Sequence, residues 1–310
     1  MGVRRAVEIA EKEAARNRSL SGGSRVYTLG PLIHNQKALA DLDSQGVKII
    51  DDLPAFKSSL SVSDYSSATV IIRTHGVCPG AEEELRGMGC RVVDATCPKV
   101  KQSQLKVREL ASRGFYLFLA GEEKHAEITG LLGFASRGYA EFTSSGVNDD
   151  QSHIKDNKFS EVVGSAEEAL SAALSLCNVN KNAKTALIGQ TTIGEDQYND
   201  IANAIKKYFP SLMVINSICA ATKERQNALR ELLPLSDALI VAGGNESANT
   251  RCLYSIAKEN GKPCVLARNS LDIPPDFFSY ENIGLCAGAS TPDSVINEIE
   301  SSLTREGFLE

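Results

Sequence analysis

Two cysteines occupy matching places in this 310-residue chain, each between an apolar run and a stretch with helical periodicity. Cys97 and Cys219 are each followed, 24 residues later, by a glycine that closes the next apolar run, Gly121 and Gly243. A cysteine in the first turn of a helix meets unpaired N–H groups and the positive end of the helix dipole, which favour the thiolate. Thiolate is the form that ligates metal. The spacing therefore predicts a strand–cysteine–helix–strand unit that is used twice and presents a metal-binding thiol each time.

Polar groups that suit a phosphate-bearing ligand gather in the segments that follow the predicted strands. Three of the four histidines lie there, namely His34, His75 and His125. The other groups are neutral hydrogen-bonding side chains: Gln190, Thr191, Thr192, Ser247, Asn249, Ser290 and Thr291. Such groups, with protonated histidines and helix N-termini, can hold phosphate oxygens without a Lys or Arg cluster. Glu127, two residues after His125, is a candidate proton donor if burial adjusts its pKa.

The elements that would position these residues alternate as in βαβ units. A helical pattern opens the chain at Gly2, and strand-like runs follow at 25–29, 47–50, 69–72, 92–96, 115–120, 186–188, 214–218, 238–242 and 264–266. The predicted fold class is α/β, with three similar units and mainly parallel sheets.

The three predicted units divide the chain into consecutive segments. The first covers 1–96, the second 97–215 and the third 216–290. A surface excursion near 144–158, which contains His153, lengthens the second unit. The C-terminal segment 291–310 is expected to pack back on the first unit.

Composition excludes several classes of protein. A net charge of −6 without a Lys/Arg cluster argues against a nucleic-acid partner. No apolar stretch approaches the roughly 20 residues that span a bilayer, and no signal peptide is recognisable, so we expect a cytoplasmic protein without membrane association. The eight cysteines are then reduced thiols. Five lie in or beside apolar patterns and are expected in the core: Cys90, Cys177, Cys252, Cys264 and Cys286.

A set of short motifs runs in order through nearly the whole chain. These are 2–6 (GVRRA), Ile33-His34-Asn35, 74–77 (THGV), 94–98 (DATCP), His125-Ala126-Glu127, Gln190-Thr191-Thr192, 219–222 (CAAT) with Arg225-Gln226, Ser247-Ala248-Asn249, and 288–293 (GASTPD). In these motifs the chain resembles the 4-hydroxy-3-methylbut-2-enyl diphosphate reductases of the non-mevalonate isoprenoid pathway.

The resemblance implies a trefoil of α/β units around a central 4Fe-4S cluster. One cysteine from each unit would hold the cluster, and of these three ligands the chain carries two, Cys97 and Cys219. Three protein ligands leave one iron open to act as a Lewis acid on the substrate's hydroxyl. Two electrons and protons then remove that hydroxyl as water, giving isopentenyl and dimethylallyl diphosphates. Reduced ferredoxin or flavodoxin is the implied electron donor.

The resemblance also assigns residue roles. Glu127, His125 and Thr191 are implied as the catalytic group, with Glu127 directing proton delivery and Thr191 near the substrate hydroxyl. The implied contacts to the allylic diphosphate are His34, His75, His125, Ser247, Asn249 and Ser290.

Two departures from the family pattern leave alternatives open. The family's first cluster cysteine belongs two residues before Gly2 and is not in this sequence. Either the start codon is assigned too far downstream, or the chain is truncated. If it is truncated, Cys78 is the nearest candidate for a substitute ligand. Ala248 replaces a serine often found in the family. The alternatives are a degenerate cluster-binding homologue without activity, and a zinc hydrolase that uses Cys and His from these loops.

Overall fold

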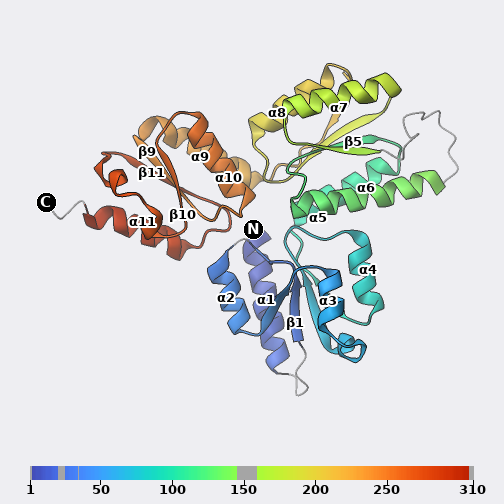
Figure 1. The fold of residues 1–310 in the computed structure, drawn as a ribbon, viewed down its shortest axis with the longest axis horizontal. Coiled ribbons are helices and arrows are strands. Elements are labelled where there is room, and N and C mark those ends of the chain that lie inside the picture. The colour runs from blue at the N-terminus through green and yellow to red at the C-terminus, as the bar shows by residue number, and fades with distance from the viewer. Residues whose placement is uncertain (1, 20–24, 34, 145–158, 307–310) are drawn as a thin grey trace. The chain divides into compact units, whose positions relative to one another are not determined.

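The computed structural model describes residues 2–19, 25–33, 35–144 and 159–306. Within these ranges the strands form three sheets, and every strand pairing in them is parallel (Figure 1). The prediction of an α/β fold with three mainly parallel sheets is therefore confirmed. No helix in the described part of the chain is long and apolar enough to cross a membrane.

The chain divides into two compact units. The larger unit comprises Met1–Ile33, Lys37–Thr191 and Glu195–Ser217, and the smaller unit comprises His34–Gln36, Thr192–Gly194 and Ile218–Glu310. Two of the sheets lie in the larger unit and the third in the smaller. The domain boundaries expected after residues 96 and 215 stay a prediction.

Sheet A has the strand order β2-β1-β3-β4. Its strands are β1 (Arg25–Leu29), β2 (Val47–Ile50), β3 (Ala68–Ile72) and β4 (Arg91–Asp94), and the helices of this segment are α1 (Gly2–Arg18), α2 (Gln36–Ser44), α3 (Leu53–Ser59) and α4 (Pro79–Gly87). Val26 and Ile71 pack on one face with Ala10 of α1, while Val70 packs on the other face with Phe56 of α3. Alternation along the strands thus buries both faces under helices.

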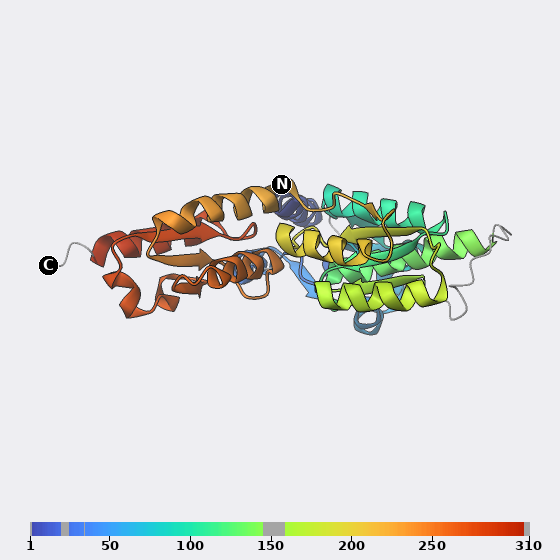
Figure 2. The same cartoon turned by 90° about the horizontal axis from the view of Figure 1, so that it is seen from above.

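Sheet B has the order β6-β5-β7-β8. Its strands are β5 (Tyr116–Ala120), β6 (Ser160–Val163), β7 (Thr185–Gly189) and β8 (Met213–Val214), and its helices are α5 (Pro98–Ala111), α6 (Ala126–Ser144), α7 (Ala166–Val179) and α8 (Glu195–Lys206). Helices α7 and α8 pack side by side (Figures 1 and 2). Helices α5 and α6 also pack together and cover one face through Val107, Leu110 and Leu131. The expected surface excursion, with His153, lies outside the described residues.

Sheet C, in the smaller unit, has the order β10-β9-β11. Its strands are β9 (Ala238–Ala242), β10 (Cys264–Ala267) and β11 (Ile283–Ala287), and its helices are α9 (Ala220–Leu232), α10 (Ala248–Glu259) and α11 (Asp293–Glu306). Helix α11 buries Ile299 against Ile240 of β9. The apolar side of α11 thus covers the sheet that immediately precedes it in the chain. The expectation that the C-terminal segment packs back on the first α/β unit stays a prediction.

Candidate active site

Cys97 occupies the position predicted for it, at the N-cap of α5. Its backbone angles are φ −56° and ψ 131°, and its thiol makes no capping hydrogen bond. The turn that carries it is fixed by its neighbours: the Cys97 N–H donates to the carbonyl of Thr74 (2.9 Å), and the Arg5 guanidinium donates to the carbonyl of Thr96 (3.2 Å). Pro98 then starts the helix, where its missing N–H costs nothing. The thiol is thus presented at a helix N-terminus by a constrained turn.

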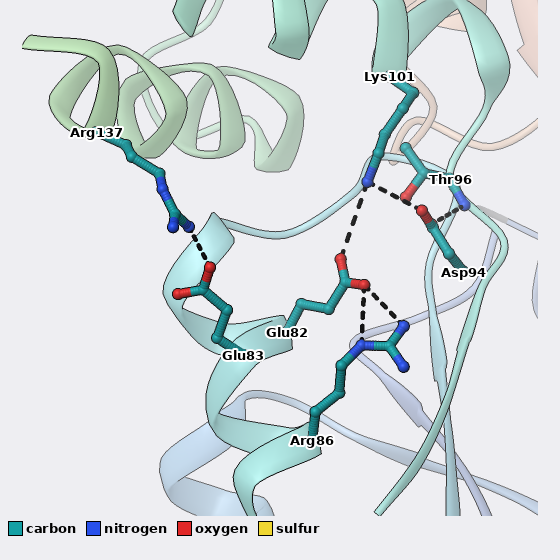
Figure 3. Close-up of polar contacts among 7 residues, drawn as sticks. All are labelled: Glu82, Glu83, Arg86, Asp94, Thr96, Lys101 and Arg137. Atoms are coloured by element: carbon teal, nitrogen blue, oxygen red, sulfur yellow. Dashed lines mark hydrogen bonds and ion pairs between the residues drawn. The ribbon is translucent and has the colours of Figure 1, made fainter. Parts of the chain in front are cut away.

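A network of charged residues braces the same turn (Figure 3). Asp94, at the end of β4, accepts hydrogen bonds from the backbone N–H of Thr96 (2.9 Å) and from Lys101 of α5 (3.0 Å). Partial burial opposes ionisation of Asp94, but the hydrogen bonds from Thr96 and the charge of Lys101 hold its pKa below the usual value. Lys101 also lies 3.9 Å from Glu82 of α4. The end of β4, α4 and the first turn of α5 are thereby tied together.

Cys219 has the same local setting in the smaller unit. It is the N-cap of α9, with φ −67° and ψ 132°, and its thiol likewise makes no capping hydrogen bond. Its carbonyl accepts the first helical bonds, from the N–H groups of Thr222 and Lys223. The prediction that both cysteines stand between a strand and a helix start agrees with this placement, although β8 is only two residues long.

Gly2, the first residue of α1, lies against the Cys97 thiol. A Cβ atom on Gly2 would be 2.8 Å from Sγ of Cys97, closer than side chains approach one another. The absence of a side chain on Gly2 therefore leaves room beside the sulfur. Within the described ranges, no three His, Cys, Asp or Glu side chains gather in a metal-binding arrangement.

Cys78, the sequence-based substitute ligand, is the exposed N-cap residue of α4. It packs against Gly133 of α6, where a Cβ atom would be 2.6 Å from its own Cβ. Its thiol has a setting like those of Cys97 and Cys219 but is more exposed.

His75 and His125, separated by 50 residues in the sequence, come together in the larger unit. Their rings meet edge to face, with centroids 5.2 Å apart and planes at 86°. His125 precedes α6, and its Nδ1 accepts a hydrogen bond from the backbone N–H of Glu127 (3.2 Å). This bond fixes Nδ1 as an acceptor, so the neutral ring carries its proton on Nε2.

Glu127 and Thr191 form a buried polar pair. The Glu127 side chain is 1% exposed, and its two oxygens accept hydrogen bonds from the backbone N–H and from Oγ1 of Thr191, each 2.9 Å long. Burial raises the pKa of Glu127 to about 7, although both hydrogen bonds pull in the opposite direction. The carboxyl group is thus placed to exchange a proton near neutral pH.

In the smaller unit, the N-terminus of α10 presents Ser247 and Asn249. Ser247 is the N-cap, and its Oγ accepts from the N–H of Thr250 (3.4 Å). Asn249 is 3% exposed, and neither polar atom of its amide has a hydrogen-bond partner in the described part of the chain. Because buried amides are rarely unsatisfied, this one is a candidate for a contact to a ligand. Ser290 is partly exposed in the turn after β11.

The structure thus gathers the predicted residues in two groups. His75, His125, Glu127 and Thr191 belong to the larger unit, and Ser247, Asn249 and Ser290 to the smaller. His34 lies outside the described residues.

Thr74 has a positioning role that the sequence did not reveal. It is buried, its Oγ1 donates to the carbonyl of Leu32 (3.0 Å), and its carbonyl accepts from Cys97. It therefore joins the loops that follow β1, β3 and β4. Its place in the THGV motif was the only signal, because a threonine next to a histidine does not by itself indicate such contacts.

Comparisons with known proteins agree on one family. Residues 1–304 match the model of the LytB protein family. A protein of Treponema pallidum (strain Nichols), named 4-hydroxy-3-methylbut-2-enyl diphosphate reductase, is 40% identical, with 99% of this chain and 81% of that protein covered. The protein of the same name from Treponema denticola is 38% identical, with 97% and 94% covered.

A solved structure shares the fold. It is that of the E-1-hydroxy-2-methyl-but-2-enyl-4-diphosphate reductase from Plasmodium falciparum, which superposes with a TM-score of 0.80 at 24% identity and covers 98% of this chain and 84% of its own. With the family model matched almost end to end and relatives close to 40% identical, this chain belongs to the LytB protein family.

Proposed function

We propose that this chain is a 4-hydroxy-3-methylbut-2-enyl diphosphate reductase. It takes up two electrons and two protons, releases the substrate's hydroxyl as water, and forms isopentenyl and dimethylallyl diphosphates. The observation that carries the proposal is the placement of Glu127. Its buried carboxyl accepts two hydrogen bonds from Thr191, and its backbone N–H donates to Nδ1 of His125. Relatives covered over most of their length bear the name of this activity.

The donor chemistry of the chain is compatible with an iron-sulfur cluster. Cys97 and Cys219 stand at helix N-termini with matching backbone angles and thiols that cap nothing, and Gly2 leaves space beside Sγ of Cys97. These two thiolates would hold the cluster as two of its three expected protein ligands. When bound, the cluster supplies the electrons and a Lewis-acidic iron for the departing hydroxyl.

Proton delivery is assigned to Glu127 and Thr191. A carboxyl with a pKa of about 7 is protonated in about half of the molecules at neutral pH. The Glu127 oxygen that meets Oγ1 of Thr191 can pass its proton through that hydroxyl to the substrate oxygen. Enclosure of the pair keeps the proton from bulk water.

Diphosphate binding is assigned to neutral donors and histidines. His34, His75 and His125 would supply ring N–H groups, and Ser247, Asn249 and Ser290 a hydroxyl, an amide and a hydroxyl. The unsatisfied amide of Asn249 supports this role. The N-terminus of α10, which begins directly after Ser247, adds the favourable end of a helix dipole.

Anaerobic reconstitution with iron and sulfide, followed by turnover of the hydroxylated diphosphate with a reduced ferredoxin, a reduced flavodoxin or an artificial low-potential donor, tests the proposal. We expect iron and sulfide to bind in stoichiometric amounts and both isomeric products to form. A cluster without turnover would favour the degenerate homologue. Zinc in place of iron and sulfide would favour the hydrolase.

A further inference from the structure

The three sheets share one topological feature. In each of them the first strand in sequence lies between the next two, so that chain order reverses between β1 and β3, between β5 and β7, and between β9 and β11. Open α/β sheets bind ligands beyond the carboxyl ends of their strands at such a reversal. The residues that follow the two central strands at each reversal can therefore be compared position by position.

At each reversal a glycine ends the first strand. Gly30, Gly121 and Gly243 follow β1, β5 and β9, with φ angles of +76°, +157° and +142°. The strand register ends on the pairs Leu29–Ile72, Ala120–Gly189 and Ala242–Ala287. The residues opposite the three glycines are consequently Arg73, Gln190 and Gly288, in the same order.

In sheets B and C the polar side chains beside this glycine are neutral. One in each sheet, Gln190 and Thr291, is hydrogen-bonded within the protein, whereas Oγ1 of Thr250, also beside Gly243, has no partner among the described residues. Oε1 of Gln190 accepts from the N–H of Glu122 (3.2 Å), and a Cβ on Gly121 would be 2.8 Å from that oxygen. In sheet C, Thr291 Oγ1 donates to the carbonyl of Ala242 (2.9 Å).

Sheet A differs, because the side chain at its reversal is charged and has no counter-charge among the described residues. Arg73 extends from the end of β3 over Gly30, where a Cβ would collide with Nη1 and lie 3.0 Å from Cζ. Its Nε is buried without a hydrogen bond, and no carboxylate in the described part of the chain forms an ion pair with it. Burial alone lowers the pKa of Arg73, with no acidic group to offset it. A partly buried cation without a counter-charge is energetically unfavourable.

We propose that Arg73 is a contact for phosphoryl oxygens at the carboxyl end of sheet A. The guanidinium presents its N–H groups as a rigid fork that matches two phosphate oxygens. This inference rests on the proposed function to the extent that the anion is the diphosphate of the substrate, since His75 lies two residues further along the same turn. Arg73 would supply a positive charge that persists at pH values where histidines are neutral.

Calorimetric titration with inorganic diphosphate tests the contact directly. Arg73→Gln should weaken binding by about ten- to a hundredfold, the range expected for a lost hydrogen bond to a charged group. Arg73→Lys, which keeps the charge but loses the fork, should fall between. Arg25→Gln is the matched control, because Arg25 is exposed at the amino end of β1 in the same sheet and should bind as the wild type does. Equal affinity of Arg73→Gln and wild type would overturn the proposal.

A second readout holds even if Arg73→Gln fails to fold. In the wild-type protein the ¹⁵Nε–¹H signal of Arg73, assigned through Arg73→Lys, should shift when diphosphate is added. An unmoved signal at saturating diphosphate would overturn the contact.

If Arg73→Gln folds, its thermal midpoint without ligand should equal or exceed that of the wild type, because an uncompensated cation has been removed. A clear fall in the midpoint with unchanged affinity would assign Arg73 to structure alone.

Kinetics distinguish the sources of the anion. If Arg73 binds the substrate's diphosphate, Arg73→Gln raises KM for the hydroxylated diphosphate with little change in kcat. If it binds free phosphate or diphosphate, KM is unchanged while inorganic phosphate and diphosphate bind more weakly, and the contact still stands. The wild-type protein could bind diphosphate through Arg73 and yet fail to reduce the substrate. That result would refute the proposed function and leave this inference intact.

Discussion

Glu127 accepts two hydrogen bonds from one residue, Thr191, which lies 64 positions later in the chain. The two bonds hold both carboxylate oxygens of Glu127, in the first turn of α6, against the segment that follows β7. Because the side chain is almost fully buried, the two bonds do not prevent its pKa from rising to about 7. Burial of Glu127 between α6 and the segment after β7 therefore gives this glutamate a pKa suited to a general acid.

Removal of this carboxyl should slow turnover. Glu127→Gln preserves the shape of the side chain but carries no transferable proton, so we expect kcat to fall by about 10²- to 10⁴-fold at neutral pH. Steady-state assays of the reconstituted enzyme measure the loss. Glu123→Gln, at an exposed glutamate in the loop that precedes α6, serves as the control. A Glu127→Gln enzyme that retained full kcat would remove Glu127 from the catalytic group.

The same residue should make stability depend on pH. Its pKa rises from 4.5 in the unfolded chain to about 7 in the folded protein. Between these values the folded state holds the extra proton, so stability falls as pH increases through this window and levels off above it. The Glu127→Gln variant has no titrating carboxyl here and does not lose this stability. The free energy of unfolding of the variant minus that of the wild type should therefore increase by up to about 3 kcal/mol from about pH 4 to about pH 8. Denaturant titrations across this range, with Glu123→Gln alongside, provide the measurement.

Thr191 should tune that pKa. Its hydrogen bonds favour the ionised carboxylate, so Thr191→Val, which removes the Oγ1 donor, should raise the pKa of Glu127 further. The limb of the pH–rate profile that reports this group should move to higher pH. Thr191→Ser keeps the donor and should leave the limb in place. If the pH–rate profiles of Thr191→Val and Thr191→Ser coincide, the Thr191 hydroxyl does not affect the pKa of Glu127.

The two N-cap cysteines should be required for cluster retention. Cys97→Ser and Cys219→Ser each replace a thiolate with a poorer iron ligand, and we expect iron and sulfide content after anaerobic reconstitution to drop sharply. Cys177→Ser, near the end of α7, should bind as much as wild type. Retention of a full cluster by either N-cap variant would show that the altered cysteine is not a ligand.

The brace on the Cys97 turn should contribute modestly to stability. Asp94→Asn weakens the contacts to Thr96 and Lys101, and we expect a loss of about 1 kcal/mol, kept small because the Asp94 side chain is 31% exposed. The pKa of Asp94 is lowered in the fold, so this contribution is present at neutral pH and disappears as pH falls through that pKa. Urea titrations at neutral and acidic pH check both parts. If Asp94→Asn is as stable as the wild type at neutral pH, these contacts contribute no measurable free energy to folding.

Local sequence was informative where a short run decides the structure. The predicted strands at 25–29 and 47–50 coincide with β1 and β2, and Gly121 and Gly243 close β5 and β9 with positive φ angles that few other residues adopt. Strand β6 was not predicted, because its four residues mix polar and apolar types and only Val163 is buried. The packing of α11 on sheet C could not be predicted either, since an amphipathic pattern identifies a buried face but not the sheet that buries it.

The sequence by itself determined the α/β class, the repeated cysteine position at a helix start, and the polar loops after the strands, because each depends on neighbours within a few residues. Tertiary structure decided what these groups can do. The raised pKa of Glu127, the edge-to-face contact of His75 with His125, and the unsatisfied Nε of Arg73 all depend on desolvation and contacts between segments far apart in the chain. Burial and long-range hydrogen bonding exist only once segments distant in sequence have packed together, so no local pattern could reveal them.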